Sequence, residues 1–430
     1  MSIIILYVIL FPDFWESEVS FLKLLEQYRG LRKEIYVLFF CELIDNAGSM
    51  VGPLLTLILS TKMGLDAGSI ATYFLIYTAL SLPIHLLGGK LTDRMNKKLL
   101  INLCDISTSL LYIFCGFCEL SYAVLALYLL GSLIQTVESP VYKSLIADFT
   151  SADDRDRAYS LSYLGLNLGL VLAPILGSVL MKDHLGLLFI LSGVFELFSL
   201  LIFDLFVKDT GIISPSGNTY EEQKTGESVW RILRNGRVLI PFLAIFSLSM
   251  LVYNMYSYLI PLDLTAIHGD DGSIFYGTIS SLNCATVLIF TAVLTAVFSR
   301  RTDLDKMISG NLFEIVGLSL FFFFFGKPVV YYVAIVLFTF GEILNTTTTT
   351  PYLTKRIPSN YRGRVLAVMS VSSHVTVSLG KYVIGKIYDL ISPTAAWVVV
   401  LVLGVLTVLA YLLIKTPDRK TFPALYPKSH

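Results

Sequence analysis

Two carboxylates stand close together in the first long apolar segment of the sequence. Glu42 and Asp45 are three residues apart, and Asn46 follows directly. Residues three apart share one face of a helix, and from a start near Glu34 this pair lies roughly 12–17 Å along it, near mid-bilayer. Desolvation favours the neutral form of a carboxylate, and two neighbouring carboxylates oppose each other's ionisation. The pair could therefore exchange a proton; the structural alternative is a hydrogen bond to a neighbouring helix.

Further polar residues recur in later apolar segments. Gln135 and Glu138 are three apart in one segment, and Glu342 and Asn345 are three apart in another. One constant shift along the chain lays the first pair on the second, which indicates an internal repeat. Ionisable groups at membrane depth are costly and mark functional sites by default, with packing hydrogen bonds as the alternative. We expect Glu196, Asp204 and Glu314, on other segments, to be structural or interfacial.

The elements that must hold these residues are membrane helices. Hydrophobic residues make up 55% of the chain and charged residues 15%, against about 25% charged residues in a soluble domain, and the mean hydropathy is +0.72. A spanning helix needs about 20 apolar residues, and only helices satisfy the backbone of such segments in lipid. We predict an all-α integral membrane protein with twelve spans near 34–61, 67–89, 99–119, 122–147, 157–181, 185–207, 237–262, 273–299, 307–326, 328–353, 364–389 and 393–415.

Basic residues predict the orientation of these spans. With the N-terminus inside, the outer loops hold only three of the 32 Lys and Arg residues, namely Lys62, Lys182 and Lys327. Short loops rich in Lys and Arg stay cytoplasmic, so we expect both termini in the cytoplasm and the protein in the plasma membrane. The expected divisions are an amphipathic segment at 1–33, six-helix bundles at 34–207 and 237–415, a linker at 208–236 and a tail at 416–430. A parallel repeat of two six-helix halves is a transporter architecture.

A basic stretch between the second and third spans, Gly88 to Lys98, reads G-G-K-L-T-D-R-M-N-K-K. We interpret it as a tight turn. It resembles the loop signature of the major facilitator superfamily, Gly-x-Leu-Ala/Ser-Asp-Arg-x-Gly-Arg/Lys-Arg/Lys, and departs from it at Thr92 and Asn96. We expect Asn96 to adopt the left-handed conformation that Gly provides in the signature. The resemblance covers residues 34 to 415 and implies twelve helices in two pseudo-repeats. The expected latch between the halves consists of Gly89, Asp93, Arg94, Lys97 and Lys98.

The resemblance also implies that the first, fourth, seventh and tenth helices line a central cavity. On that expectation the substrate and proton-coupling residues are Glu42, Asp45, Asn46, Gln135, Glu138, Tyr253, Asn254, Tyr256, Glu342 and Asn345. A pattern from the fifth helix of drug/proton antiporters is partly matched by Gly169, Ala173, Pro174 and Gly177, with Pro174 expected to kink that helix. Their fourth-helix Arg has no counterpart here, which weighs against a proton antiporter specifically.

These features favour a secondary transporter that works by alternating access, acts as a monomer and exports a small amphipathic or drug-like compound in exchange for protons. Uptake of a nutrient or metabolite by symport, and lipid flipping, stay open as alternatives. The sequence has no Gly-x4-Gly-Lys-Ser/Thr motif for ATP, no net charge to attract nucleic acid, and no second Cys or His pair beside Cys115 and Cys118. We therefore expect no cofactor and no metal. Five scattered histidines leave a membrane enzyme or sensor as a remote alternative.

Overall fold

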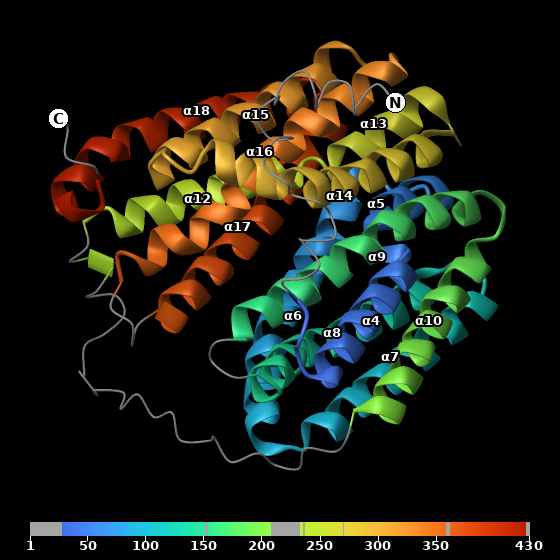
Figure 1. Ribbon diagram of the computed structural model, residues 1–430. Coiled ribbons are helices and arrows are strands. Elements are labelled where there is room, and N and C mark those ends of the chain that lie inside the picture. The colour runs from blue at the N-terminus through green and yellow to red at the C-terminus, as the bar shows by residue number, and fades with distance from the viewer. Residues whose placement is uncertain are drawn as a thin grey trace, which may run out of the picture.

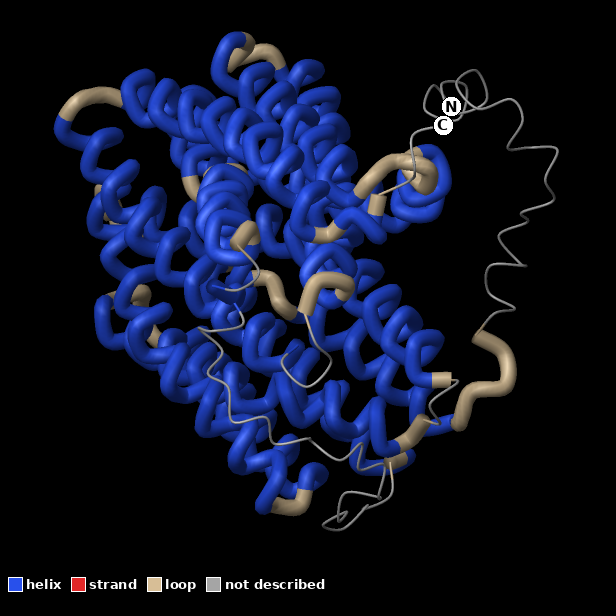
Figure 2. Tube along the Cα trace, turned by 90° about the vertical axis from the view of Figure 1, so that its left-hand side faces the viewer, coloured by secondary structure: helices blue, strands red, loops and turns tan. Residues whose placement is uncertain are grey.

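The computed structural model describes residues 28–150, 154–207, 233–234, 237–269, 271–357 and 362–426. All regular elements in this part of the chain are helices joined by short loops, as Figure 2 shows. Nearly all of the expected N-terminal segment (1–33) and linker (208–236) lies outside the described residues. The chain is an all-α integral membrane protein.

Each half of the molecule consists of six membrane-spanning helical segments, which we call rods, and the first rod of each half is built from consecutive helices (Figure 1). The N-terminal rods are α4 (Lys33–Gly48) continued by α5 (Val51–Leu57) and η1 (Ile58–Lys62), α6 (Ala67–Arg94), α7 (Lys97–Phe117), α8 (Tyr122–Asp148), α9 (Arg155–Asp183) and α10 (Leu185–Phe206). The C-terminal rods are α12 (Leu239–Asn254) continued by α13 (Leu259–His268), α14 (Asp271–Val297), α15 (Asp303–Phe323), α16 (Pro328–Thr354), α17 (Arg362–Leu390) and α18 (Pro393–Thr421). A short helix, η3 (Pro423–Leu425), follows. Among the described residues, ten helical stretches are long and apolar enough to cross a membrane by themselves.

The first rod of each half is broken at a corresponding place. Pro53 lies four residues after Ser49, where α4 ends, and Pro261 lies four residues after Ser257, in the turn between α12 and α13. Proline has no N–H for the carbonyl four residues earlier, and its ring clashes with that carbonyl. The carbonyl freed at Ser257 instead accepts a hydrogen bond from the Thr56 hydroxyl of the other half (3.1 Å).

Small residues allow α9 to lie directly against α4. A side chain at Gly169 would meet the backbone oxygen of Leu43 at 2.5 Å, and one at Gly177 would meet Leu54. Ala173, between them, is fully buried. Close approach of helices through small residues is typical of membrane interfaces. Although Pro174 was expected to kink this helix, α9 continues as one helix through it.

The two halves meet mainly through α9 with α14 and α6 with α17. We call the end at which α10 finishes and α12 begins the linker end, and the opposite end the far end. The hydrogen bonds and ion pairs described between the halves run from mid-length, at Thr78 and Ser378, to the far end. Figure 1 shows the bundles diverging toward the left, where α12 and α17 begin and α6 ends. The two halves are therefore in contact at the far end of the molecule.

The basic stretch at Gly88 to Lys98 is mostly helical, contrary to the predicted turn. α6 continues to Arg94 and α7 begins at Lys97, so only Met95 and Asn96 connect them. Asn96 has φ −60° and caps α7, its side chain accepting the N–H of Leu99 (3.1 Å). The prediction of a left-handed Asn96 is wrong, because a helix start there demands a cap in extended geometry.

The last helix extends past the predicted end of its span. α18 continues to Thr421 because Asp418, which is fully buried, pairs with Arg356 at the end of α16. Tyr352 and Tyr426 also donate hydrogen bonds to Asp418 (2.9 and 2.5 Å). The charges that read as a tail are thus part of the folded C-terminal half.

Candidate functional site

A cavity of about 400 Å³ lies within the N-terminal half, lined by α4, α5, α7, α8 and α10 with one residue of α9. No Lys, Arg or His is among the residues that line it. The polar side chains that line it are Glu42, Asp45, Asn46, Ser49, Asp105, Tyr112, Tyr128, Gln135, Glu138, Tyr142, Ser192 and Glu196. The cavity is therefore acidic, with no described basic group to neutralise it.

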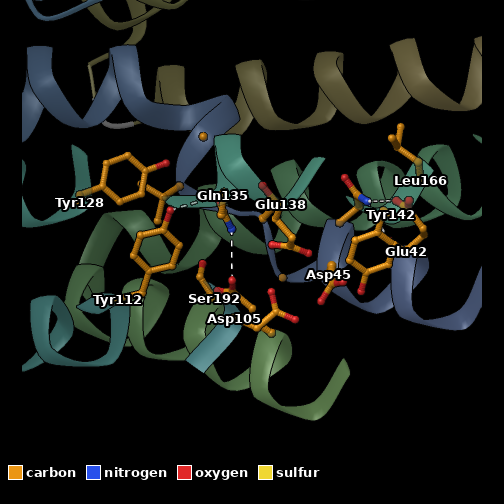
Figure 3. Close-up of a pocket in the computed structure, with 16 residues that line it drawn as sticks. Glu42, Asp45, Asp105, Tyr112, Tyr128, Gln135, Glu138, Tyr142, Leu166 and Ser192 are labelled. Atoms are coloured by element: carbon orange, nitrogen blue, oxygen red, sulfur yellow. Dashed lines mark hydrogen bonds between the residues drawn. The ribbon is translucent and has the colours of Figure 1, made fainter. Parts of the chain in front are cut away.

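Three carboxylates meet on one side of this cavity. Asp105 of α7, Glu138 of α8 and Glu196 of α10 each place an oxygen within 4.8 Å of the others. Asp105 and Glu196 are buried, at 2% and 7% exposure. Figure 3 shows Asp105 and Glu138 turned toward one another, with Asp45 beside them. We call Asp45, Asp105, Glu138 and Glu196 the acidic cluster.

The acidic cluster is incompletely hydrogen-bonded. Gln135 donates to Glu196 (3.4 Å) and accepts from the Tyr112 hydroxyl (3.2 Å). One oxygen of Asp45 is buried and has no hydrogen-bond partner among the described residues. Burying a charge without a partner is costly, so these carboxylates require bound protons or a cation.

Glu42 and Asp45 both line this cavity, but they have different neighbours. Glu42 accepts hydrogen bonds from Ser162 (3.2 Å) and from Asn46 (3.3 Å), and Figure 3 shows the second of these. The carboxylate pair predicted within one helix is thus replaced by a cluster drawn from four helices.

Sequence reasoning missed two members of the cluster. Asp105 was not selected, and Glu196 was expected to be structural or interfacial. The cost of a lone carboxylate in an apolar segment was the signal available for both. The sequence alone does not show which side of α7 and of α10 faces the cavity.

The predicted site residues of the C-terminal half lie in separate hydrogen-bond networks. Glu342 accepts from Asn283 (2.7 Å) and from Tyr253 (3.0 Å), whose ring stacks on Phe338. Asn254 donates to the backbone of Met250. These side chains do not line the acidic cavity.

Asn345 and Tyr256 are buried inside the C-terminal half, contrary to the expectation that they face a cavity. Asn345, at 4% exposure, donates to Glu314 (2.8 Å) and accepts from Asn311 (3.2 Å). Tyr256, at 8% exposure, donates to Ser280 (2.8 Å). Both side chains therefore point at hydrogen-bond partners on neighbouring helices of the C-terminal half and not into a central cavity.

The internal repeat shows how the halves differ. The shift that superposes Glu138 on Asn345 also superposes Glu42 on Ser249 and, within one residue, Asp105 on Asn311. In the C-terminal half these three positions carry uncharged side chains: Ser249 donates to Asn311 (2.7 Å) and Asn311 donates to Asn345, which in turn donates to Glu314. The same shift superposes Gln135 on Glu342. Each half therefore carries carboxylates, but at different positions of the repeat.

The expected latch residues divide into two groups. Lys97 forms an ion pair with Asp148 of α8, and Lys98 forms one with Asp204 of α10 (3.2 Å). Both partners belong to the N-terminal half, so in this conformation these lysines do not join the halves. The side chains of Asp93 and Arg94 lie outside the described part of the structure, and Gly89 has no side chain.

Comparison with known proteins decides the family. A profile described as Major Facilitator Superfamily matches residues 36–381. The chain belongs to the Major Facilitator Superfamily. In this superfamily member the twelve rods form two six-helix pseudo-repeats, and the protein is a multi-pass membrane transporter and not an enzyme.

Individual relatives of this superfamily member are distant. It is 22% identical over 69% of its length to the uncharacterized MFS-type transporter YqjV of Bacillus subtilis (strain 168), of which the match covers 72%. It is 20% identical over 87% of its length to a Na(+), Li(+), K(+)/H(+) antiporter of Planococcus maritimus, covering 92% of that protein. Among solved structures it resembles a POT family transporter in complex with a thioalcohol conjugated peptide. That match has a TM-score of 0.74 at 14% identity and covers 92% and 99% of the two chains.

Proposed function

We propose that this transporter is a proton-coupled antiporter that exports a small amphipathic compound, with the acidic cluster as its proton-exchanging group. The observation that carries the proposal is three carboxylates within 4.8 Å of one another, in a cavity lined by no basic residue. Carboxylates this close cannot all be ionised, so the cluster holds protons. Substrate arriving at the same cavity would displace them.

Aromatic side chains beside the cluster support an amphipathic substrate. The rings of Tyr112 and Tyr128 stack at 5.1 Å between centroids. Tyr128 and Gln135 also line a second cavity, of about 490 Å³, to which α6 contributes Tyr73, Phe74 and Tyr77. Aromatic faces and carboxylates together suit an apolar compound that carries a positive charge.

We propose the same topology as the sequence predicts, with both termini in the cytoplasm and the monomer as working unit in the plasma membrane. The linker end is then the cytoplasmic end. The bundles diverge there and are joined at the far end (Figure 1), which supports an inward-facing conformation for export of a cytoplasmic compound.

Ethidium efflux from proteoliposomes under an imposed pH gradient tests the coupling. Asp105→Asn and Glu196→Gln are expected to lower gradient-driven efflux at least tenfold. Glu314→Gln is the matched control, since Glu314 is a carboxylate at 1% exposure in the C-terminal half, and it should retain most of the activity. Efflux that ignores the gradient, or that all three variants lower equally, would exclude the assignment.

A second candidate function is exchange of Na⁺, Li⁺ or K⁺ for protons. It is favoured by the Planococcus maritimus relative, which is described as an antiporter of these ions, and by the carboxylate oxygens, which suit hard cations. Adding each chloride salt to proteoliposomes that contain a pH-sensitive dye distinguishes the two. Proton release with salt and none with ethidium would favour this candidate, whereas movement of substrate and protons in one direction would indicate symport.

A further inference from the structure

The first turn of α6 is capped by both halves of the molecule. The side chain of Asp66, the residue before α6, accepts the N–H of Ser69 (3.0 Å). Asp389, near the end of α17 in the other half, accepts the N–H groups of Ala67 (3.1 Å) and Gly68 (2.6 Å). A helix start leaves its first N–H groups unpaired and carries a partial positive charge. The Asp389 carboxylate therefore satisfies α6 across the boundary between the halves.

The geometry around this cap requires an unusually close approach of the two helices. A side chain at Gly68 would lie 3.0 Å from the Asp389 carboxylate, and one at Gly385 would lie 2.3 Å from the Tyr258 hydroxyl. Tyr258 is fully buried and donates to the backbone oxygen of Ala67 (2.5 Å). Gly68, Gly385 and the buried Tyr258 thus allow Asp389 to lie close enough to cap α6.

A buried lysine in the same seam acts in the opposite direction. Lys381 of α17 is 7% exposed, with its ammonium 4.8 Å from the Phe74 ring of α6 and 5.9 Å from the Tyr258 ring. Within the described part of the chain, no carboxylate forms an ion pair with it. Contact with aromatic rings offsets only part of the cost of burying a charge. Separation of the halves would return this ammonium to water.

We propose that the seam between α6 and α17 is a balanced gate at the far end of the transporter. The Asp389 cap holds the gate closed, and the unpaired charge of Lys381 favours its opening. Alternating access needs two conformations of similar free energy, because a state that is too stable would trap the carrier. Opposed interactions in one seam provide that balance, and neither belongs to the acidic cluster.

The test measures the distance between the halves at the far end, in detergent and without substrate. Spin labels carried by unnatural amino acids at Tyr122 and Val329, which are 71% and 77% exposed at the starts of α8 and α16, leave the native cysteines in place. Asp389→Ala should raise the ratio of long to short distances roughly fivefold, as expected for the loss of a helix cap. Lys381→Met should lower that ratio by a comparable factor.

Two variants control for effects that do not depend on the gate. Asp66→Ala removes a cap from the same helix turn; its hydrogen bond with Ser69 lies within one half, and only its carboxylate charge also acts on residues of α17. Lys327→Met removes an exposed lysine that lies over the Phe324 ring (5.9 Å), also within one half. Neither should change the distance ratio.

Two results would contradict the proposed gate. Equal shifts with Asp389→Ala and Asp66→Ala would reduce Asp389 to a general stabiliser of α6, and opening by Lys381→Met would reverse the role of the lysine. If Asp389→Ala does not fold, Asp389→Asn and Gly385→Ala replace it, the second by forcing Tyr258 and Ala67 apart. Both are expected to open the far end, and no shift with either rejects the proposal. These measurements involve no transport, so they stand apart from the proton assay.

Discussion

Asp105 and Asp418 show two different ways of burying a carboxylate in this protein. Asp105, at 2% exposure, faces the carboxylates Glu138 and Glu196. Asp418, at 0% exposure, faces the guanidinium of Arg356 with two hydrogen bonds (2.9 and 2.6 Å). The first must share protons with its neighbours, whereas the second is an ion pair of fixed charge. Only the first arrangement can change its charge during a transport cycle at constant structure.

Replacement of Asp105 by Asn should affect function more than stability. The amide keeps the shape of a protonated carboxylate and removes one charge from a crowded site, so we expect an unfolding midpoint in detergent equal to or above that of the wild type. Thermal unfolding followed by tryptophan fluorescence checks this. A large loss of stability would mean that Asp105 is ionised and needed for packing.

Replacement of Asp418 by Asn should have the reverse effect. Breaking a buried ion pair leaves the Arg356 charge without its partner and costs about 3–5 kcal/mol. We expect a clearly lower unfolding midpoint, with gradient-driven efflux retained in the folded fraction. Retention of full stability would show that Arg356 reaches water in the variant.

At the scale of elements, two prolines accompany the breaks in the first rods, and one of these breaks frees a backbone carbonyl for a hydrogen bond between the halves. Pro53 and Pro261 break the first rod of each half, and the break at Pro261 frees the Ser257 carbonyl for Thr56. Pro174 lies inside α9 without breaking it. A proline in a membrane helix is thus tolerated where a neighbouring helix satisfies the freed backbone group.

Pro261→Ala should restore a continuous helix through α12 and α13. The new N–H at position 261 would pair with the Ser257 carbonyl and compete with Thr56 for it. We expect slower amide hydrogen exchange in a peptide covering residues 255–261, measured by mass spectrometry. Pro174→Ala is the control and should leave exchange in that peptide unchanged; equal exchange in both variants would show that packing alone sets the break.

The cap at Asp66 gives a prediction for pH. A hydrogen bond with Ser69 holds the pKa of Asp66 below its usual value, so its contribution to stability is present above pH ~4 and is lost as pH falls through the folded-state pKa. Because Asp66 is exposed, we expect Asp66→Ala to cost only about 0.5 kcal/mol at neutral pH. Unfolding midpoints of wild type and variant should converge below pH ~3. If the difference in unfolding midpoint between wild type and variant does not depend on pH, the charge of Asp66 is not its cause.

At the scale of the whole molecule, the two halves share a fold but not a chemistry. The N-terminal half holds the four carboxylates of the acidic cluster at one cavity, whereas in the C-terminal half Glu314 and Glu342 are each hydrogen-bonded to amide side chains of neighbouring helices. The halves are joined at the far end, and the residues that line the cavity all belong to the N-terminal half. Under the proposed function, proton exchange and substrate contact would be concentrated in one half.

The conformation predicts which side of the membrane reaches the cavity. Gln135 is exposed and lines both cavities, so a cysteine placed there should react with a membrane-impermeant maleimide from the linker end. We expect labelling in inside-out vesicles at least tenfold faster than in right-side-out vesicles. The wild type, whose five cysteines are buried or partly buried, sets the background, and faster labelling in right-side-out vesicles would reverse the assignment.

The sequence predicted the helices well because each span is a long apolar run bounded by charged or turn residues. The end of α18 was missed because Asp418 is neutralised by Arg356, far away in the chain. In the site, a carboxylate in an apolar run could be recognised, but the direction in which a helix turns its faces depends on packing. That is why Glu138, which was selected from the sequence, lines the acidic cavity, whereas Asn345, selected in the same way, is buried, and Asp105 was missed.

Among the described residues, no Lys, Arg or His lines the acidic cavity, and under the proposed function this has an electrical consequence. A carrier that reorients with protons on the cluster moves no net charge, while one that reorients with an ionised carboxylate moves negative charge through the membrane field. Each elementary charge is worth about 2.3 kcal/mol per 100 mV. The membrane voltage would then act on the return of the empty carrier, and this transporter would draw on voltage as well as on the pH difference even when its cargo is neutral.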